Sequence, residues 1–225
     1  MQAQRELQQQ SIYIRGMNIL IVASTQFEIA PFLNQDHLPK KIDVLISGVG
    51  VPSTTFHLTR KLHHHHYDLV IQAGVAGTAS DDLALGETVL VRKDAFADLG
   101  AFENGSFKSL TDMDLSHEME WLINPNDQLL GQLNFKKVKA VTVNSVGDNE
   151  KILGAISNKW NNPEIESMEG AALHYVCNHL HKPYLQLRSI SNKVGVRDKS
   201  QWKMELAIEN LNQSLMEIVN HSAGH

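Results

Sequence analysis

Cysteine and basic charge are both scarce in this sequence. A single cysteine, Cys177, occurs among 225 residues, which excludes an internal disulfide and a metal site made of several thiolates. The formal net charge is −5, so no basic surplus is available to neutralise the phosphates of nucleic acid or of an anionic membrane. The longest apolar runs, such as Ile19 to Ala23, fall far short of the ~20 residues that a membrane helix needs. These absences predict a cytoplasmic protein that binds neither nucleic acid nor membranes.

Several familiar catalytic and ligand-binding motifs are absent as well. No Gly-Lys-Ser/Thr sequence follows a glycine turn, and neither the G-x-S-x-G turn of serine hydrolases nor the H-E-x-x-H motif of zinc proteases occurs. His63 to His66 resemble metal ligands in composition, but consecutive helical residues do not face one point, whereas residues three or four apart do. We interpret them as the solvated end of a helix, and we expect neither a metal ion nor a cofactor.

Short apolar runs rich in valine and isoleucine recur along the chain. Each is nearly continuous in apolar residues at its centre, which is typical of strands buried on both faces. The predicted strands are Asn18–Ala23, Ile42–Ser47, Leu69–Ala73, Glu87–Arg92, Val138–Asn144 and Tyr184–Ile190. The first sixteen residues are polar and rich in glutamine, so we expect 1–16 to be a disordered extension and 17–225 to form a single domain.

Helical patterns lie between several of these strands. They cover Phe27–Leu33, Ser53–Leu62, Gly170–Leu180 and Trp202–Val219. The third of them contains Cys177, which we interpret as a buried thiol. Two further segments, Asp98–Ser109 and Ser116–Asp127, are rich in loop-forming residues, with partial helix expected at Glu118–Ile123. The alternation of strands and helices predicts an α/β domain with helices packed over a central sheet.

The residues that follow the predicted strands are the best candidates for a site, because ligands of such sheets bind beyond the carboxyl ends of the strands. Two of these segments are rich in glycine, Gly48-Val49-Gly50 and Gly74-Val75-Ala76-Gly77. Glycine permits a close approach of the backbone to a ligand, or a positive φ. Each segment is therefore either a ligand-binding turn or a plain tight turn between a strand and a helix.

Glu169 stands at the entry to the predicted helix Gly170–Leu180, within the run Glu166-Ser167-Met168-Glu169-Gly170-Ala171-Ala172. A carboxylate at this position can bind the free N–H groups of the first helical turn. It can also accept hydrogen bonds from the vicinal hydroxyls of a sugar. The pattern by itself leaves both roles open.

Taken in order, these segments resemble the nucleoside phosphorylase/nucleosidase superfamily, and within it the futalosine hydrolases. The resemblance extends over roughly Met17 to Val219, and it depends on the order and spacing of short motifs. Those motifs are Ile21-Val22-Ala23 followed by Glu28, then Ser47-Gly48-Val49-Gly50, Gln72 to Gly77, Glu166 to Ala172, and Arg188 to Asp198. The resemblance implies a three-layer α/β/α fold around a central twisted mixed sheet that is partly barrel-like.

The resemblance also implies roles for individual residues. Glu28 corresponds to the carboxylate that activates the attacking water, and Asn192 to the side chain that faces the purine N7. The implied substrate-binding residues are Ala76 and Gly77 beside the base and sugar, and Met168 and Glu169 at the ribose, with Glu169 on the 2′- and 3′-hydroxyls. Cleavage of an N-glycosidic bond produces an oxocarbenium-like sugar and an anionic purine. Carboxylates near the ribose and a polar group at N7 stabilise those two charges.

The sequence departs from the phosphorolytic members of the superfamily after the first strand. Those members carry a Gly-Asp-Pro-x-Arg-like loop that binds phosphate. Here the segment Ala23 to Glu28 has no arginine and ends in an acid. Because a carboxylate repels phosphate, we expect water to be the nucleophile.

Asn192 marks a second departure, since nucleosidases of methylthioadenosine and S-adenosylhomocysteine have aspartate at this position. Adenine offers a 6-amino donor beside the N7 acceptor, whereas hypoxanthine offers two acceptors, O6 and N7. The amide NH₂ of asparagine can donate to both acceptors, and sites built on such matching discriminate strongly. Asn192 therefore predicts a 6-oxopurine; the alternative is that it only caps a loop.

These observations predict the hydrolysis of futalosine to hypoxanthine and dehypoxanthine futalosine, a step of menaquinone biosynthesis in the family that the chain resembles. Three alternatives stay open. They are a nucleosidase of methylthioadenosine or S-adenosylhomocysteine, a phosphorylase, and a non-catalytic nucleoside-binding protein on the same fold.

Two further features bear on substrate and partners. Arg197 can pair with the benzoate carboxylate of futalosine or, locally, with Asp198. The loop 94–109 can serve a subunit interface, since the superfamily forms dimers or larger homo-oligomers. The aromatic residues in this loop can cover a ligand tail or contact a partner subunit; they are Phe96, Phe102 and Phe107.

Overall fold

The computed structural model describes residues 16–35, 38 and 41–220. The predicted extension 1–16 lies outside the described residues except for Gly16. Within the described part of the chain, no helix is both long and apolar enough to span a bilayer.

A mixed sheet forms the centre of the molecule. Its strands are β1 (Ile19–Ala23), β2 (Ile42–Ile46), β3 (Leu69–Thr78), β4 (Thr88–Asp94), β7 (Leu122–Ile123), β8 (Lys136–Thr142), β9 (Ile165–Ser167) and β10 (Tyr184–Lys193). The strand order is β10-β4-β8-β9-β3-β1-β2, and β10 also pairs with β3. The strands from β3 through β10, β4, β8 and β9 back to β3 therefore close on themselves. This closure confirms the predicted partly barrel-like sheet.

Strand β3 has two different neighbours along one edge. Residues 69–72 pair with β1, whereas Gly77 and Thr78 pair with β9. On its other edge β3 pairs with β10 from Val70 to Thr78. The edge that faces β1 and β9 is thus unpaired between Gln72 and Gly77, and the two neighbours diverge there.

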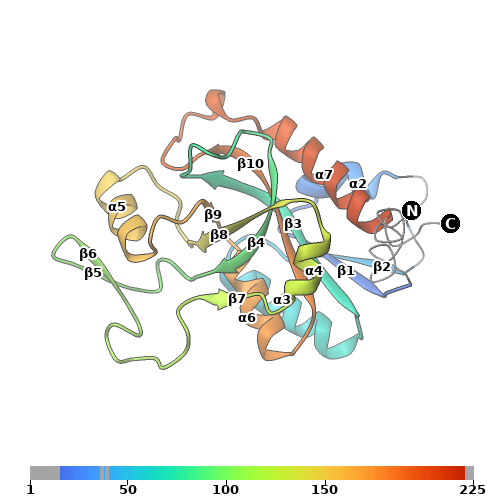
Figure 1. Cartoon of the computed structure of the whole chain (residues 1–225), viewed down its shortest axis with the longest axis horizontal. Helices are drawn as coiled ribbons and strands as arrows, with labels where there is room; N and C mark the ends of the chain where they lie inside the picture. The colour runs from blue at the N-terminus through green and yellow to red at the C-terminus, as the bar shows by residue number, and fades with distance from the viewer. Residues whose placement is uncertain (1–15, 36–37, 39–40, 221–225) are drawn as a thin grey trace, which may run out of the picture.

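Helices cover both faces of the sheet (Figure 1). One face carries α2 (Ala30–Leu33) and α7 (Met204–Asn220), and the other carries α3 (Val51–His64) and α6 (Gly170–His179). The remaining elements are the short helices η1 (Phe27–Ile29), α4 (Asp127–Gln132) and η2 (Lys199–Gln201), the helix α5 (Glu150–Lys159), and the hairpin of β5 (Gly100–Glu103) and β6 (Ser106–Ser109). The arrangement confirms the predicted three-layer α/β/α fold.

The sequence of β1 explains why this strand lies between two layers of helices. All five residues of this strand are buried, and successive side chains point to opposite faces. Ile19 and Ile21 pack in the same core as Leu211 of α7. Leu20 packs in a second core with Leu58 of α3. A continuous apolar run is therefore required here because both faces of the strand are covered.

Three predictions about secondary structure were wrong. The segment Glu118–Ile123 contains no helix, and its last two residues form β7 because they pair with Lys93 and Asp94 of β4. The segment Asp98–Ser109 is a loop followed by the β5–β6 hairpin, which packs on α5 through Phe107. The segment Gly74–Gly77 is not a turn, because pairing with β10 extends β3 to Thr78.

Two interpretations of single sites agree with the structure. Cys177 is buried in α6, and burial raises the pKa of its thiol. The four histidines from His63 to His66 are exposed where α3 ends. Both features follow from the local pattern of apolar and polar residues.

A buried polar cluster fixes the start of α6. The Asp94 carboxylate accepts hydrogen bonds from Thr142 Oγ1 at 3.0 Å and from Gln186 Nε2 at 3.1 Å, and burial raises its pKa to about 6. Thr142 Oγ1 in turn accepts the Ala171 N–H at 2.8 Å. A Cβ on Gly170 would overlap both Gln186 Nε2 and Asp94 Oδ2. The first turn of α6 can therefore approach the cluster only because residue 170 is glycine.

We predict that Gly170→Ala destabilises the protein by ~1–3 kcal/mol or more, because the added methyl forces the buried cluster apart. Gly154→Ala in α5 is the matched control, since its Cβ meets no atom within 4 Å. Replacing a helical glycine by alanine should stabilise by ~0.5–1 kcal/mol. Urea unfolding followed by circular dichroism measures both variants. Equal midpoints for the two would contradict the assignment of the Asp94 cluster as the anchor of α6.

Candidate active site

A cavity of about 310 Å³ opens where β3 separates from β1 and β9. Its walls come from the segment after β1, the ends of β3, β9 and β10, and the loop that follows β10. All of the predicted site residues line it: Glu28, Ala76, Gly77, Met168, Glu169, Asn192 and Arg197. The structure thus brings together residues that are far apart in the sequence, from Glu28 to Arg197.

Glu28 is buried in the gap along β3. Its Oε1 accepts the N–H of Val75 at 3.2 Å, which is free because this part of the strand edge is unpaired. Its Oε2 accepts hydrogen bonds from the N–H and the hydroxyl of Thr25, both at 3.0 Å. The carboxylate is therefore held at a fixed orientation toward the cavity.

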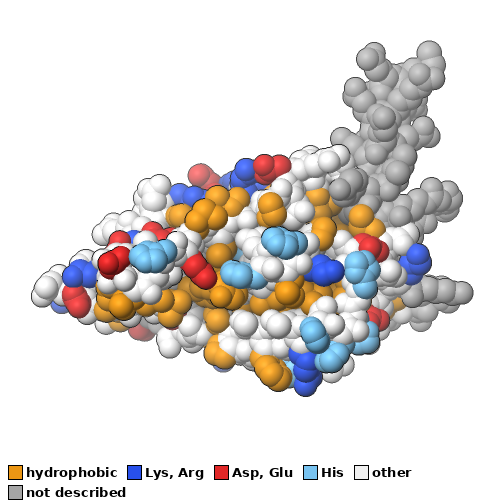
Figure 2. All heavy atoms as spheres, turned by 90° about the horizontal axis from the view of Figure 1, so that it is seen from below, with side chains coloured by type: hydrophobic (Ala, Val, Ile, Leu, Met, Phe, Trp, Pro, Cys, Tyr) orange, Lys and Arg blue, Asp and Glu red, His pale blue; other side chains and the backbone are white. Residues whose placement is uncertain are grey.

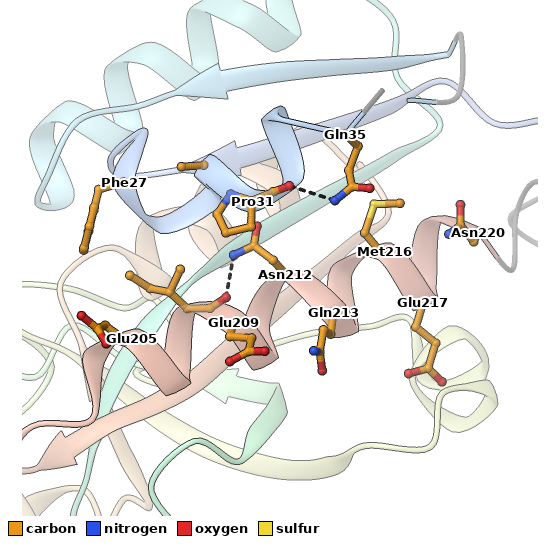
Figure 3. A pocket seen from close by; sticks show the side chains of 12 residues that line it. Phe27, Pro31, Gln35, Glu205, Glu209, Asn212, Gln213, Met216, Glu217 and Asn220 are labelled. Carbon is orange, nitrogen blue, oxygen red and sulfur yellow. Dashed lines mark hydrogen bonds between the residues drawn. The ribbon is translucent and has the colours of Figure 1, made fainter. Parts of the chain in front are cut away.

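Helix α7 holds the backbone of Glu28 in place through Asn212. Asn212 Nδ2 donates to the Glu28 carbonyl at 2.9 Å, and Asn212 Oδ1 accepts the Phe32 N–H at 3.0 Å. Figure 3 shows this side chain between α7 and the segment around Pro31, beside a groove of about 810 Å³. The groove shares Phe27 with the cavity but not the Glu28 carboxylate.

Glu169 does not cap its own helix. It occupies the N-cap position of α6 without a side-chain capping bond, so the capping interpretation was wrong. Its Oε1 instead accepts the N–H of Gly50 at 3.0 Å, across 119 residues of sequence. Gly50 has φ 89°, a left-handed conformation that favours glycine, and this aims its N–H at the carboxylate. The segment Gly48–Gly50 is therefore a turn that positions a site residue.

Arg188 lies beneath both carboxylates, and sequence reasoning did not assign it a role. Its Nη1 is 3.7 Å from Glu169 Oε2, and its Nη2 donates to Gln72 Oε1 at 2.8 Å. A Cβ on Gly74 would overlap Nη1 and lie 3.0 Å from Glu28 Oε1, so glycine permits this close approach. The sequence contained one signal for this role, since Arg188 stands in a predicted buried strand. Arginine is almost never fully buried unless it is paired, so a charged partner could have been expected.

The charges around Glu28 set its acidity. Burial raises the pKa of its carboxyl group, the guanidinium of Arg188 opposes this effect, and the negative charge of Glu169 adds to it. The net result is a pKa above the ordinary value for glutamate. A carboxylate with a raised pKa is a stronger base, which suits the removal of a proton from water.

Asn192 is held by its two neighbours in sequence. Its Nδ2 donates to the carbonyl of Lys193 at 2.8 Å, and its Oδ1 accepts the Ser191 hydroxyl at 2.8 Å. A backbone carbonyl can only accept, so this contact fixes which end of the amide is nitrogen. One N–H of Nδ2 then remains available to a ligand, rather than the two that the sequence suggested.

Arg197 lines the cavity but does not pair with Asp198. Its guanidinium lies 5.5 Å from the centre of the Trp202 ring, whereas Asp198 accepts hydrogen bonds from Ser200 and Gln201 at the start of η2. The expected local ion pair was therefore wrong, because the Asp198 carboxylate is used as a helix cap.

The three phenylalanines of the loop 94–109 lie outside the cavity. Phe102 and Phe107 pack against each other at 5.0 Å, and Phe96 contacts Tyr175 at 6.0 Å. Phe107 packs in one cluster with Ala155 and Ile156 of α5, and Phe96 lies against Tyr175 of α6, so neither covers this cavity within its own chain.

Comparison with known proteins identifies the family of this chain. A model described as "Phosphorylase superfamily" matches residues 39–220. The futalosine hydrolase of Thermus thermophilus is 26% identical over 80% of this chain and 82% of its own length. The futalosine hydrolase of Streptomyces coelicolor is 27% identical over 82% of this chain and 81% of its own length.

A solved structure has the same fold. It is the 5′-methylthioadenosine/S-adenosylhomocysteine nucleosidase of Colwellia psychrerythraea in complex with adenine, with a TM-score of 0.75 and 18% identity. The match covers 93% of this chain and 97% of that one. At this identity the likeness concerns the fold and not the substrate.

Proposed function

The chain belongs to the phosphorylase superfamily, and from this premise we propose that it is a purine nucleosidase that hydrolyses the N-glycosidic bond of futalosine. The observation that carries the proposal is the pair of buried carboxylates, Glu28 and Glu169, on either side of the Arg188 guanidinium at the floor of one cavity. Glu28 takes the proton of the attacking water. Glu169 binds the ribose hydroxyls, and its negative charge favours the positive charge that develops on the sugar.

Hydrolysis suits this site better than phosphorolysis. Glu28 presents a negative charge that repels phosphate, and the Arg188 guanidinium is already bound to Gln72 and the Val75 carbonyl. Of the described residues that line the cavity, Arg197 is the basic one, and it lies over Trp202. A phosphate ion would thus face a buried acid without a dedicated cation.

The proposed substrate carries a 6-oxopurine base. Asn192 supports this assignment, because its free Nδ2–H can donate to O6 of hypoxanthine, whereas adenine presents an amino donor at that position. Similarity to proteins named futalosine hydrolase supports the same substrate. The products that we propose are hypoxanthine and dehypoxanthine futalosine, in menaquinone biosynthesis. The likeness to an adenine-bound structure makes a methylthioadenosine/S-adenosylhomocysteine nucleosidase the second candidate.

We predict that Glu28→Gln lowers kcat by ~10²–10⁴-fold, because the amide cannot take a proton from water. Base release is followed by HPLC with futalosine, inosine, methylthioadenosine and S-adenosylhomocysteine, each with and without phosphate. The wild type should release hypoxanthine from futalosine independently of phosphate.

Each other result of that assay has a definite meaning. Near-normal kcat in Glu28→Gln removes this residue from the mechanism. Turnover that requires phosphate identifies a phosphorylase, and adenine release from the wild type identifies the second candidate. A bound nucleoside that stays intact in the wild type identifies a non-catalytic binding protein.

We predict that Asn192→Asp shifts the ratio of hypoxanthine to adenine release toward adenine by at least ~10-fold. An aspartate here faces the Lys193 carbonyl, which favours its protonated form. Its proton is then donated to the Lys193 carbonyl, and its other oxygen can accept a hydrogen bond from the adenine amino group. The measurement is kcat/KM for inosine and adenosine with both proteins. An unchanged ratio would show that the 6-position of the base is recognised elsewhere.

We propose that the protein forms homo-oligomers through the face of α3 and α6. Hydrophobic side chains form a band across this face (Figure 2). Four hydrophobic residues in or near α3 in sequence or in space are between 53% and 74% exposed: Val49, Phe56, Leu115 and Met119. Leu115 and Met119 line one hollow with Val51 of α3, and Phe56 lines another with the same Val51. Exposed apolar patches of this kind are typical of interfaces. Val49 also lines the cavity, so the partner would lie at its rim.

Sedimentation velocity tests the interface. The wild type should sediment as a dimer or larger species, and Phe56→Asp should shift it toward the monomer, because a charge would be buried at the interface. Phe27→Asp is the control, since Phe27 is 65% exposed and lies outside α3 and α6. A monomeric wild type would contradict the proposal.

A further inference from the structure

One carboxylate of the cavity has no assigned task. Glu166, on β9, lines the cavity together with Glu28 and Glu169. Those two residues each accept at least one backbone N–H. The Glu166 carboxylate, in contrast, has no hydrogen-bond donor and no ion-pair partner among the residues that the structure describes. It is half-buried and faces the space that a ligand would occupy.

The sheet register places Glu166 opposite Asn192. Gly77 of β3 pairs with Glu166 on one side and with Asn192 on the other. Residues paired directly across neighbouring strands direct their side chains to the same face. The two side chains thus start from backbones ~10 Å apart, two strand spacings, with a glycine between them. Because Gly77 has no side chain, the space between Glu166 and Asn192 stays open.

A Cβ added to Gly77 would narrow this space. On Gly77 it would lie 3.2 Å from Asn192 Nδ2 and 3.2 Å from the Val194 side chain. The loop after β8 limits the space from another side, since Val146 and Gly147 also line the cavity. That loop is held by Asp98, which accepts hydrogen bonds from the N–H and the side chain of Asn144.

The surroundings make the unpaired carboxylate costly. Burial raises the pKa of Glu166 to about 7, the negative charge of Asp98 adds to this effect, and Arg197 opposes it. A partly buried acceptor without a donor loses hydrogen bonds that water would supply. A ligand N–H directed at Glu166 would restore one such bond, and it would be a charge-assisted one.

We propose that Glu166 and Asn192 together recognise the polar edge of a 6-oxopurine, with Glu166 accepting the N1–H and Asn192 donating to N7 or O6. This inference rests on the proposed function and names the residue that selects the base. Hypoxanthine carries a proton on N1 and acceptors at O6 and N7. It therefore matches a site with an acceptor, Glu166, on one side of Gly77 and a donor, Asn192, on the other. Adenine has a lone pair on N1. At a pH above the Glu166 pKa of about 7, this lone pair would face the ionised carboxylate without a proton between them.

Glu166 is therefore a specificity-determining residue, and Gly77 provides the gap in which the base lies. The arrangement assigns one polar group to each end of the base edge, and leaves Glu28 and Glu169 to the water and the ribose. Selection of this type is strong because the wrong base leaves buried polar groups unpaired.

Equilibrium binding of free bases tests the inference without the sugar or the chemical step. Isothermal titration calorimetry at pH 8 compares hypoxanthine, 1-methylhypoxanthine and adenine on the full chain. The wild type should bind hypoxanthine at least ~10-fold more tightly than 1-methylhypoxanthine, which lacks the N1 proton. Glu166→Ala should reduce that ratio to nearly one and weaken hypoxanthine binding by a similar factor.

A conservative variant separates recognition from folding and from steric effects. Glu166→Gln keeps the size of the side chain, and its amide can donate to N1 of adenine, so adenine should gain affinity relative to hypoxanthine. Glu150→Ala is the matched control, because Glu150 is exposed at the start of α5 and does not line the cavity. Its base preferences should equal those of the wild type.

The outcomes are distinct. If Glu166→Ala and Glu166→Gln retain the wild-type ratios while the wild type binds hypoxanthine and cleaves futalosine, the role of Glu166 is refuted and the proposed function stands. If the wild type binds none of the three bases and releases no base from any nucleoside, both proposals fail together.

Discussion

Strand β3 pairs with two different strands along a single edge, and the position of the cavity depends on this constraint. The strand pairs with β1 up to Gln72 and with β9 from Gly77. Between these points its backbone groups need partners from elsewhere, since buried N–H groups are almost always hydrogen-bonded. The N–H of Val75 finds one in the Glu28 carboxylate. The unpaired stretch of β3 thus creates the place where the Glu28 carboxylate is held.

The charges at the floor of the cavity are bound into the same framework. Arg188 is buried beneath Gly74, next to Glu169 and hydrogen-bonded to Gln72. Removing one partner of such a cluster leaves an uncompensated buried charge, which is more costly than the cluster itself. Folding and chemistry therefore depend on the same contacts here. These contacts extend to α7, because Asn212 of this helix donates a hydrogen bond to the backbone carbonyl of Glu28.

The side chains of Glu166 and Asn192, in the same cavity, are attached to the framework in a different way. Here the polar groups, Glu166 and Asn192, extend from strand backbones whose pairing does not depend on their side chains. Residues at these positions can change while the sheet stays the same. A separation of this kind allows one fold to hold sites for different ligands.

The sequence by itself determined the features that arise from local pattern. Continuous apolar runs identified the long strands, helical periodicity identified α3, α6 and α7, and the ordered motifs placed Glu28, Glu169 and Asn192 at one site. The patterns did not predict the helices α4 and α5 or the strands β5, β6 and β9, because these elements are short or weakly patterned.

Only the tertiary structure decided the features that depend on distant partners. The segment Gly74–Gly77 continues a strand because β10 pairs with it. The Glu169 carboxylate turns away from its own helix because Gly50, 119 residues away, offers an N–H. Arg188 and Glu166 gain their significance from what surrounds them in space. A hydrogen bond between remote segments leaves no periodicity in the sequence, so local patterns cannot reveal it.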